Sequence, residues 1–106
     1  MYNKNTEKEQ MFLNEKEGTL KVMREIAKEL KVLAVFEKGN PPLPCKFKIT
    51  DTQGEEHTIN VDKITRIDDR RIQFVSYHCE SYSDNLSKRY LLQYWKDNYK
   101  WSLFVE

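Results

Sequence analysis

The chain has 106 residues, of which 39% are hydrophobic and 12% aromatic, and its 18 basic and 17 acidic side chains give a formal net charge of +1. This length accommodates one compact domain and excludes a multidomain arrangement. Because both signs of charge are mixed along the sequence, it has no block of single-sign charge of the kind that marks a typical nucleic-acid-binding protein.

Two features indicate a cytosolic protein. No apolar run approaches the roughly 20 residues that span a bilayer, and the N-terminal sequence MYNKNTEKEQ is too polar for the apolar region of a signal peptide. In a chain without an export signal, Cys45 and Cys79 are expected to be reduced and buried thiols rather than a disulfide.

The N-terminal third is expected to be helical or flexible. Residues 1–18 contain two capping-box spacings, TEKE and NEKE, with few apolar residues, which is typical of a flexible or partly helical arm. From Thr19 to Leu30 the apolar residues recur at helical spacing, so we predict one amphipathic helix of about three turns. Its apolar stripe consists of Leu20, Met23, Ile26, Ala27 and Leu30.

The remaining residues, 31–106, have the composition of a small β domain. Short runs of β-branched and aromatic residues alternate with turn signals at DTQG, DDR, SDN and KDN. The connections are too short for parallel βαβ units, so we expect a six-stranded antiparallel meander that curls into a small open barrel. The predicted strands are KVLAVF, CKFKIT, HTINVDKITRI, RIQFVSYHCESY, KRYLLQYW and YKWSLFV.

Several of these segments carry a resemblance to a known family. KVLAVFEKGNPPLPCKFKI, INVDKI, YHC, KRYLLQYW and YKWSL are similar to a functionally uncharacterised family of small proteins of Gram-positive bacteria, over about residues 31–106. The resemblance implies an SH3-like barrel with no assigned activity. The chain departs from the family pattern at His78, where a basic residue is expected, and at Tyr99, where members often have a second cysteine.

The run SYHCES places a histidine beside a cysteine, which raises the question of a metal or nucleophile site. Successive residues of a strand point to opposite faces, so His78 and Cys79 cannot converge on one ion. Cys79 shares its parity with Val75 and Tyr77, which predicts a buried thiol in the core rather than a reactive one.

Other arrangements for catalysis or metal binding are weaker still. A zinc site would have to gather Cys45, Cys79, His57 and His78 from three strands without any ligand spacing that supports it. The best enzyme hypothesis pairs Cys79 with His57, oriented by Asp62, but it needs a thiol in the middle of a strand. We therefore expect no enzyme activity, no catalytic residues, no metal and no cofactor.

The segment VDKI (61–64) predicts an irregularity in its strand. Ile59 and Val61 alternate, but the next apolar residues are Ile64 and Ile67, so the phase slips at Asp62 or Lys63. We expect a β-bulge there, which would bend the strand, and we expect the carboxylate of Asp62 to tie the bend.

The leading functional hypothesis is a protein-binding or accessory module. Alternation sends Leu91, Trp95 and Phe104 outward from the last two strands, with Phe74 on the same side, which would create an apolar patch. We predict that Leu20, Met23, Ile26 and Leu30 of the helix cover this patch, within the chain or across a homodimer. Alternatively, the patch stays uncovered and forms an open surface for a protein partner, made of Leu91, Trp95, Phe104 and Phe74.

The alternative function is nucleic-acid binding by a small barrel. Basic residues would contact the backbone and tyrosines would stack on bases. The candidate residues are Lys46, Lys48, Arg66, Lys88, Arg89, Tyr82 and Tyr90.

Overall fold

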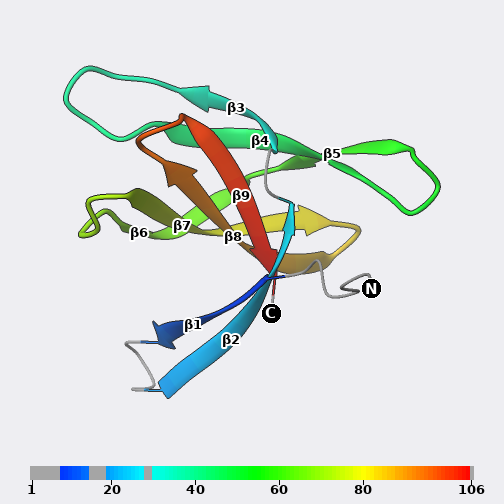
Figure 1. Cartoon of the computed structure of the whole chain (residues 1–106). Helices are drawn as coiled ribbons and strands as arrows, with labels where there is room; N and C mark the ends of the chain where they lie inside the picture. Colours follow the sequence, from blue (N-terminus) through cyan, green and yellow to red (C-terminus); the bar gives the residue numbers. More distant parts are fainter. Residues whose placement is uncertain (1–7, 15–18, 28–29, 106) are drawn as a thin grey trace, which may run out of the picture.

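The computed structural model describes residues 8–14, 19–27 and 30–105. Within these ranges the chain is mainly β, and nine strands form two antiparallel sheets (Figure 1). The six-stranded sheet has the order β1-β2-β9-β8-β7-β6, and the three-stranded sheet has the order β3-β4-β5. The strands are β1 (Lys8–Asn14), β2 (Thr19–Ala27), β3 (Lys31–Val35), β4 (Leu43–Thr50), β5 (Glu56–Asn60), β6 (Lys63–Asp68), β7 (Phe74–Ser83), β8 (Leu86–Trp95) and β9 (Lys100–Val105).

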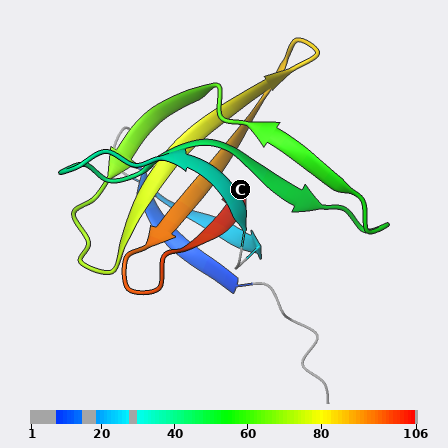
Figure 2. The ribbon, with the colours of Figure 1, turned by 90° about the horizontal axis from the view of Figure 1, so that it is seen from above.

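The two sheets pack face to face around one core. Seen from above, β3, β4 and β5 lie over β7, β8 and β9 (Figure 2). Alternate residues of β7, β8 and β9 point into this core, which confirms the parity predicted for Leu92, Tyr94, Trp101 and Leu103. The buried core residues are Leu30, Phe47, Val75, Tyr77, Cys79, Leu92, Tyr94, Trp101 and Leu103.

The chain passes between the sheets at two corners. Before β3, the backbone N–H of Leu30 donates to the C=O of Trp101 at 3.1 Å. Between β5 and β6, Val61 N–H donates to Cys45 C=O, and Asp62 N–H donates to Glu80 C=O. Because Val61 and Asp62 bond to different sheets, the predicted single strand 57–67 is in fact two strands.

Asp62 stabilises the second corner, as its position predicted. Its carboxylate accepts a hydrogen bond of 2.7 Å from the backbone N–H of Tyr82 on β7. The register irregularity, however, lies two residues later than expected, between Ile64 and Arg66 in the β6–β7 ladder. The phase slip in the sequence therefore reflects both a change of sheet and a bulge.

The predicted helix over 19–30 is wrong. Residues Thr19–Ala27 form β2, which pairs with β1 over residues 19–25 and with the end of β9. The same segment also has β-branched residues at Val22 and Ile26, so its sequence is compatible with a strand. Without β2, the hydrogen-bonding edge of β9 would lack a partner strand, and this tertiary pairing outweighs helix propensity.

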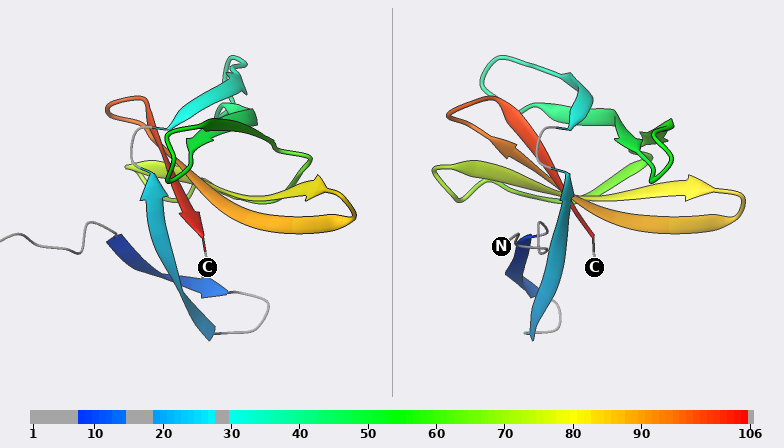
Figure 3. Two further views of the ribbon diagram at one scale, coloured as in Figure 1. Left: turned by 90° about the vertical axis from the view of Figure 1, so that its right-hand side faces the viewer. Right: turned by 45° about the vertical axis from the view of Figure 1, so that its right-hand side comes forward.

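The N-terminal hairpin extends from the edge of β9 away from the three-stranded sheet (Figure 3). Its first strand, β1, occupies part of the segment expected to be a flexible or partly helical arm. The rest of that arm, residues 1–7 and 15–18, lies outside the described residues. No helix in the described ranges is long and apolar enough to cross a membrane. No ladder within these ranges closes the two sheets into a barrel.

Candidate functional site

Cys79 and His78 lie on opposite faces of β7, as alternation predicted. Cys79 is 2% exposed in the core, and its thiol donates a hydrogen bond of 3.5 Å to the C=O of Tyr77. Burial raises the pKa of the Cys79 thiol from 9.0 to about 12. Because the neutral thiol is a poor nucleophile, Cys79 acts as a packed core residue.

The other residues considered for catalysis or metal binding are held by different partners. His57 Nε2 lies 2.8 Å from Asp51 Oδ2, and Asp51 Oδ1 accepts the backbone N–H groups of Gln53 and Glu55. The hydrogen bond from His57 is the main cause of a lowered pKa of Asp51. This cluster closes the β4–β5 turn, whereas Asp62 ties the β5–β6 corner. Among the described residues, no three His, Cys, Asp or Glu side chains are arranged to hold a metal ion.

The basic residues proposed for nucleic-acid binding are divided among three surfaces. Lys46 and Lys48 are exposed on the outer side of the three-stranded sheet, and Lys48 Nζ lies 3.9 Å from Glu56. Lys88 and Arg89 lie near the turn of the β7–β8 hairpin, paired in register with Ser81 and Glu80. Arg66 is on β6. The chain therefore does not gather these side chains into one basic footprint.

The two tyrosines of that hypothesis are engaged within the fold. The Tyr82 hydroxyl donates to Glu80 Oε1 at 3.0 Å, although its ring is half exposed. The ring of Tyr90 packs edge-on against Phe47, with centroids 5.4 Å apart. Tyr90 therefore belongs to the border of the core and is not an open stacking platform.

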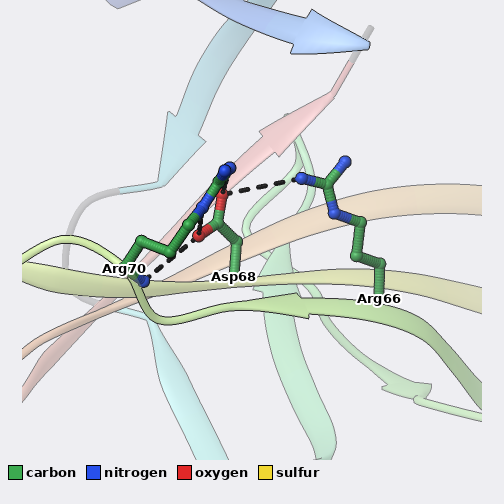
Figure 4. Close-up of polar contacts among 3 residues, drawn as sticks. All are labelled: Arg66, Asp68 and Arg70. Carbon is green, nitrogen blue, oxygen red and sulfur yellow. Dashed lines mark hydrogen bonds and ion pairs between the residues drawn. The ribbon is translucent and has the colours of Figure 1, made fainter. Parts of the chain in front are cut away.

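Arg66 belongs to a cluster at the edge of the six-stranded sheet (Figure 4). Arg70 donates from Nε and Nη2 to the two carboxylate oxygens of Asp68 at 2.9 and 2.7 Å. Arg66 Nη2 lies 3.7 Å from the same carboxylate. The bidentate contact with Arg70 holds the pKa of Asp68 well below its usual range, so the carboxylate stays ionised. This cluster organises the loop after β6.

The predicted protein-binding patch lies on the second face of the six-stranded sheet, which we define as the face turned away from the three-stranded sheet. Leu91 and Phe104 are on this face but are both 0% exposed. Trp95 and Phe74 are partly buried, with ring centroids 4.8 Å apart. The structure thus removes Leu91 and Phe104 from the accessible surface. Leu30, expected to cover them, instead lies in the core between the sheets.

The second face also contains a buried polar row that sequence analysis missed. Ser76, Gln93 and Ser102 stand opposite one another on β7, β8 and β9, and all three are buried. Trp95 Nε1 donates to Ser102 Oγ at 3.1 Å. Neither atom of the Gln93 side-chain amide has a hydrogen-bond partner among the described residues. A signal for this row was available in the sequence, because each of its polar residues stands next to a core residue: Val75, Leu92 or Leu103.

A different surface, on β3, is apolar and exposed. Leu33 and Val35 of β3 and Phe36 directly after it are 58%, 48% and 66% exposed, and they form the densest group of exposed large hydrophobic residues within 30–105. Sequence analysis assigned the segment to a barrel strand and did not identify it as a surface. An available signal was Lys31, which shares the parity of Leu33 and Val35 and marks that side as solvent-facing.

The backbone edge of β3 is also available. Among the described strands, β3 pairs only with β4, so it is an edge strand of the three-stranded sheet. Its register with β4 shifts between Leu33 and Ala34, where Pro44 stands opposite Ala34. Proline has no N–H to donate across that pair. An edge strand with open backbone groups is a template for pairing with another chain.

Next to this edge lies a row of aromatic rings. The ring of Phe36 approaches the ring of Tyr94 edge-on, with centroids 6.2 Å apart. The centroids of the Tyr94 and Trp101 rings are 4.9 Å apart. The ring centroid of Trp101 in turn lies 5.5 Å from that of Tyr77, whose hydroxyl is buried and has no partner in the part of the chain that the structure describes. The row leads from the exposed Phe36 into the core. We define the β3 surface as Leu33, Val35 and Phe36 together with the free backbone edge of β3.

No protein-family model, no curated protein and no solved structure matches this chain.

Proposed function

We propose that this protein is a non-enzymatic protein-interaction module that binds an extended partner segment at the β3 surface. The partner would add a strand to the free edge of β3, so that main-chain hydrogen bonds supply affinity and alternate side chains supply specificity. The observation that carries this proposal is the coincidence of an edge strand with three exposed large hydrophobic residues.

The geometry supports strand addition more strongly than other binding modes. Leu33 and Val35 share one side of β3, so an added strand would place its own apolar residues beside them. Phe36 extends the apolar area toward Tyr94, which offers an aromatic anchor of the kind that dominates protein interfaces. The buried thiol and the dispersed histidines do not converge on a catalytic arrangement.

The same proposal includes the finer description of the fold. The hydrogen bonds at the Leu30 and Val61 corners support a small open barrel of the SH3-like type. The likeness to small proteins of Gram-positive bacteria and a cytosolic location belong to this proposal as well. The free thiols of Cys45 and Cys79 are consistent with a reducing compartment.

Selection of peptides from a random displayed library tests the proposal. We expect the enriched peptides to have alternating apolar residues and to bind the native protein but not the Leu33→Lys or Val35→Lys variants. Each lysine replaces an exposed apolar contact, so folding is expected to be unaffected. Ile72→Lys is the matched control because Ile72 is 86% exposed on a different loop.

Backbone amide shifts in an NMR titration would then locate the bound peptide. Strand addition predicts the largest changes at residues 31–37. Peptides that bind equally well to the Leu33→Lys and Ile72→Lys variants, or that shift only residues outside β3, would contradict the proposal.

A further inference from the structure

We infer that the extended segment bound at the β3 surface is β3 of a second copy of this chain. Two copies would pair antiparallel about a two-fold axis at Ala34, joining their three-stranded sheets into one continuous sheet. This inference rests on the proposed function because it names the partner of the same surface.

The first argument is the charge pattern of residues 31–37, KVLAVFE. In an antiparallel pair centred on Ala34, Lys31 of one copy stands opposite Glu37 of the other. The symmetry repeats this pair, so the short interface contains two opposite-charge pairs, one at each end. Opposite charges directly across a strand pair are favourable, and like charges are unfavourable.

The second argument is the match of apolar residues in the same register. Leu33 stands opposite Val35 of the other copy, and both are on the exposed side of β3. Val32 stands opposite Phe36. Leu33, Val35 and Phe36, which are exposed in the monomer, would therefore each gain an apolar neighbour across the pair, and Val32, already half-buried against the core, would supply the neighbour of Phe36.

Neighbouring registers fail one of these two conditions. In one continuous sheet, residues that stand opposite each other point to the same face. The two-fold axis must therefore pass through a residue, and the nearest alternatives to Ala34 are Leu33 and Val35. Centring on Leu33 places Lys31 opposite Val35, and centring on Val35 places Glu37 opposite Leu33. Only the Ala34 register pairs both charges and both apolar positions.

The proposed dimer is a closed assembly with a small interface. A two-fold axis uses the same edge on both copies, so assembly stops at the dimer and does not propagate into a filament. An interface of one short strand with a few flanking side chains falls in the small, transient class. We expect a reversible dimer that dissociates on dilution.

Sedimentation velocity of the full chain provides the first test. We expect the weight-average sedimentation coefficient to rise between about 10 µM and about 1 mM, the range in which small interfaces associate. Lys31→Glu and Glu37→Lys should each weaken association by about tenfold, because each creates two like-charge pairs. The double variant Lys31→Glu with Glu37→Lys should restore most of it; Lys31→Glu also removes the 3.5 Å ion pair of Lys31 with Glu56 in the same copy, so Glu37→Lys, which leaves that pair intact, is the decisive single variant. A monomer throughout this range, or a double variant as weak as the singles, would overturn the inference.

Disulfide trapping tests the position of the axis. In a Cys45→Ser background, Cys79 is buried, so a cysteine introduced on β3 is the more accessible thiol, half-buried at position 34 and exposed at position 33. Ala34→Cys should form a cross-linked dimer on oxidation, because directly opposite Cβ atoms lie about 4.5–5.5 Å apart. Leu33→Cys is the matched control: it lies about 7–8 Å from its own symmetry mate and should cross-link much more slowly. Faster cross-linking of Leu33→Cys would refute this register.

A peptide separates this inference from the proposed function. The acetylated and amidated peptide KVLAVFE should bind at residues 31–37, and EVLAVFK, which has the same composition, should bind about tenfold more weakly. If library peptides bind at β3 but the protein stays monomeric and does not bind KVLAVFE, the second-copy inference fails and the proposed function stands. If no peptide binds at β3, both fail.

Discussion

The two faces of the six-stranded sheet are both buried at their centres but are built differently. The core face combines Tyr77, Leu92, Tyr94 and Trp101 with Phe47 from the opposite sheet in one large cluster. Among the residues whose side chains are described, Leu91 and Phe104 form a smaller cluster on the second face, beside the polar row. The core face joins the two sheets through one large apolar cluster, so it is expected to contribute a large part of the stabilising free energy.

The faces also differ in their unpaired polar groups. On the core face, the buried side-chain group without a partner among the described residues is the Tyr77 hydroxyl, and burial raises its pKa. The second face contains the side-chain amide of Gln93, which has a donor and an acceptor without partners. A buried polar group without a hydrogen bond costs free energy, so the second face includes a destabilising element.

The largest expected effect comes from the centre of the core face. Trp101→Ala should lower the free energy of unfolding by about 3–5 kcal/mol, because it removes an indole that contacts two other rings and leaves a cavity. Urea titration followed by circular dichroism measures the change. Ile72→Ala, on the exposed loop, should change it by less than about 0.5 kcal/mol. Similar losses in the two variants would contradict the assignment of the core.

A direct comparison of the faces uses two adjacent leucines. Leu91 and Leu92 are both 0% exposed but point to opposite faces of β8. Leu92→Ala should cost about 4–5 kcal/mol and Leu91→Ala about 2–3 kcal/mol, because Leu92 lies within the large apolar cluster whereas Leu91 lies beside the buried polar row. Denaturation curves of the two variants under the same conditions measure the losses in free energy of unfolding. An equal or larger loss for Leu91→Ala would show that the second face is the better packed.

The buried thiol predicts how stability depends on pH. The folded pKa of Cys79 is raised to about 12, so the unfolded chain releases this proton first as the pH rises. The stabilising contribution is fully present below about pH 8.5 and is lost progressively up to pH 12, by at most about 1.4 kcal/mol per pH unit. Denaturation midpoints at pH 8 and pH 10 measure this slope. Cys79→Ala should flatten it, and an unchanged slope would exclude Cys79 as its origin.

The smallest expected effect concerns the polar row. Gln93→Met has a similar shape and removes the two unpaired polar atoms, so it should raise the free energy of unfolding by about 1 kcal/mol. Ser102→Ala, which removes the acceptor for Trp95 Nε1, should lower it by about 1 kcal/mol. Thermal melting separates the two directions. A destabilised Gln93→Met protein would indicate that the amide is hydrogen-bonded in solution.

The candidate sites could be predicted from the sequence only in part. Strand parity placed Cys79 in the core and separated it from His78, and the structure shows Cys79 buried there. The same parity placed Leu91 and Phe104 on the second face. It did not show that this face is buried, because coverage depends on parts of the chain distant in sequence.

The amino-acid sequence by itself determined most strands and turns of residues 31–105, although not the division of 57–67 into β5 and β6, together with the inward residues of β7, β8 and β9 and the tie formed by Asp62. These features are local, since side-chain alternation and turn chemistry act over a few residues. Tertiary structure alone decided that residues 19–27 form β2, because the unpaired edge of β9 selects a strand from a segment compatible with either conformation. It also decided that β3 became an exposed edge, since only the order of strands in the sheets determines which edge lacks a neighbour.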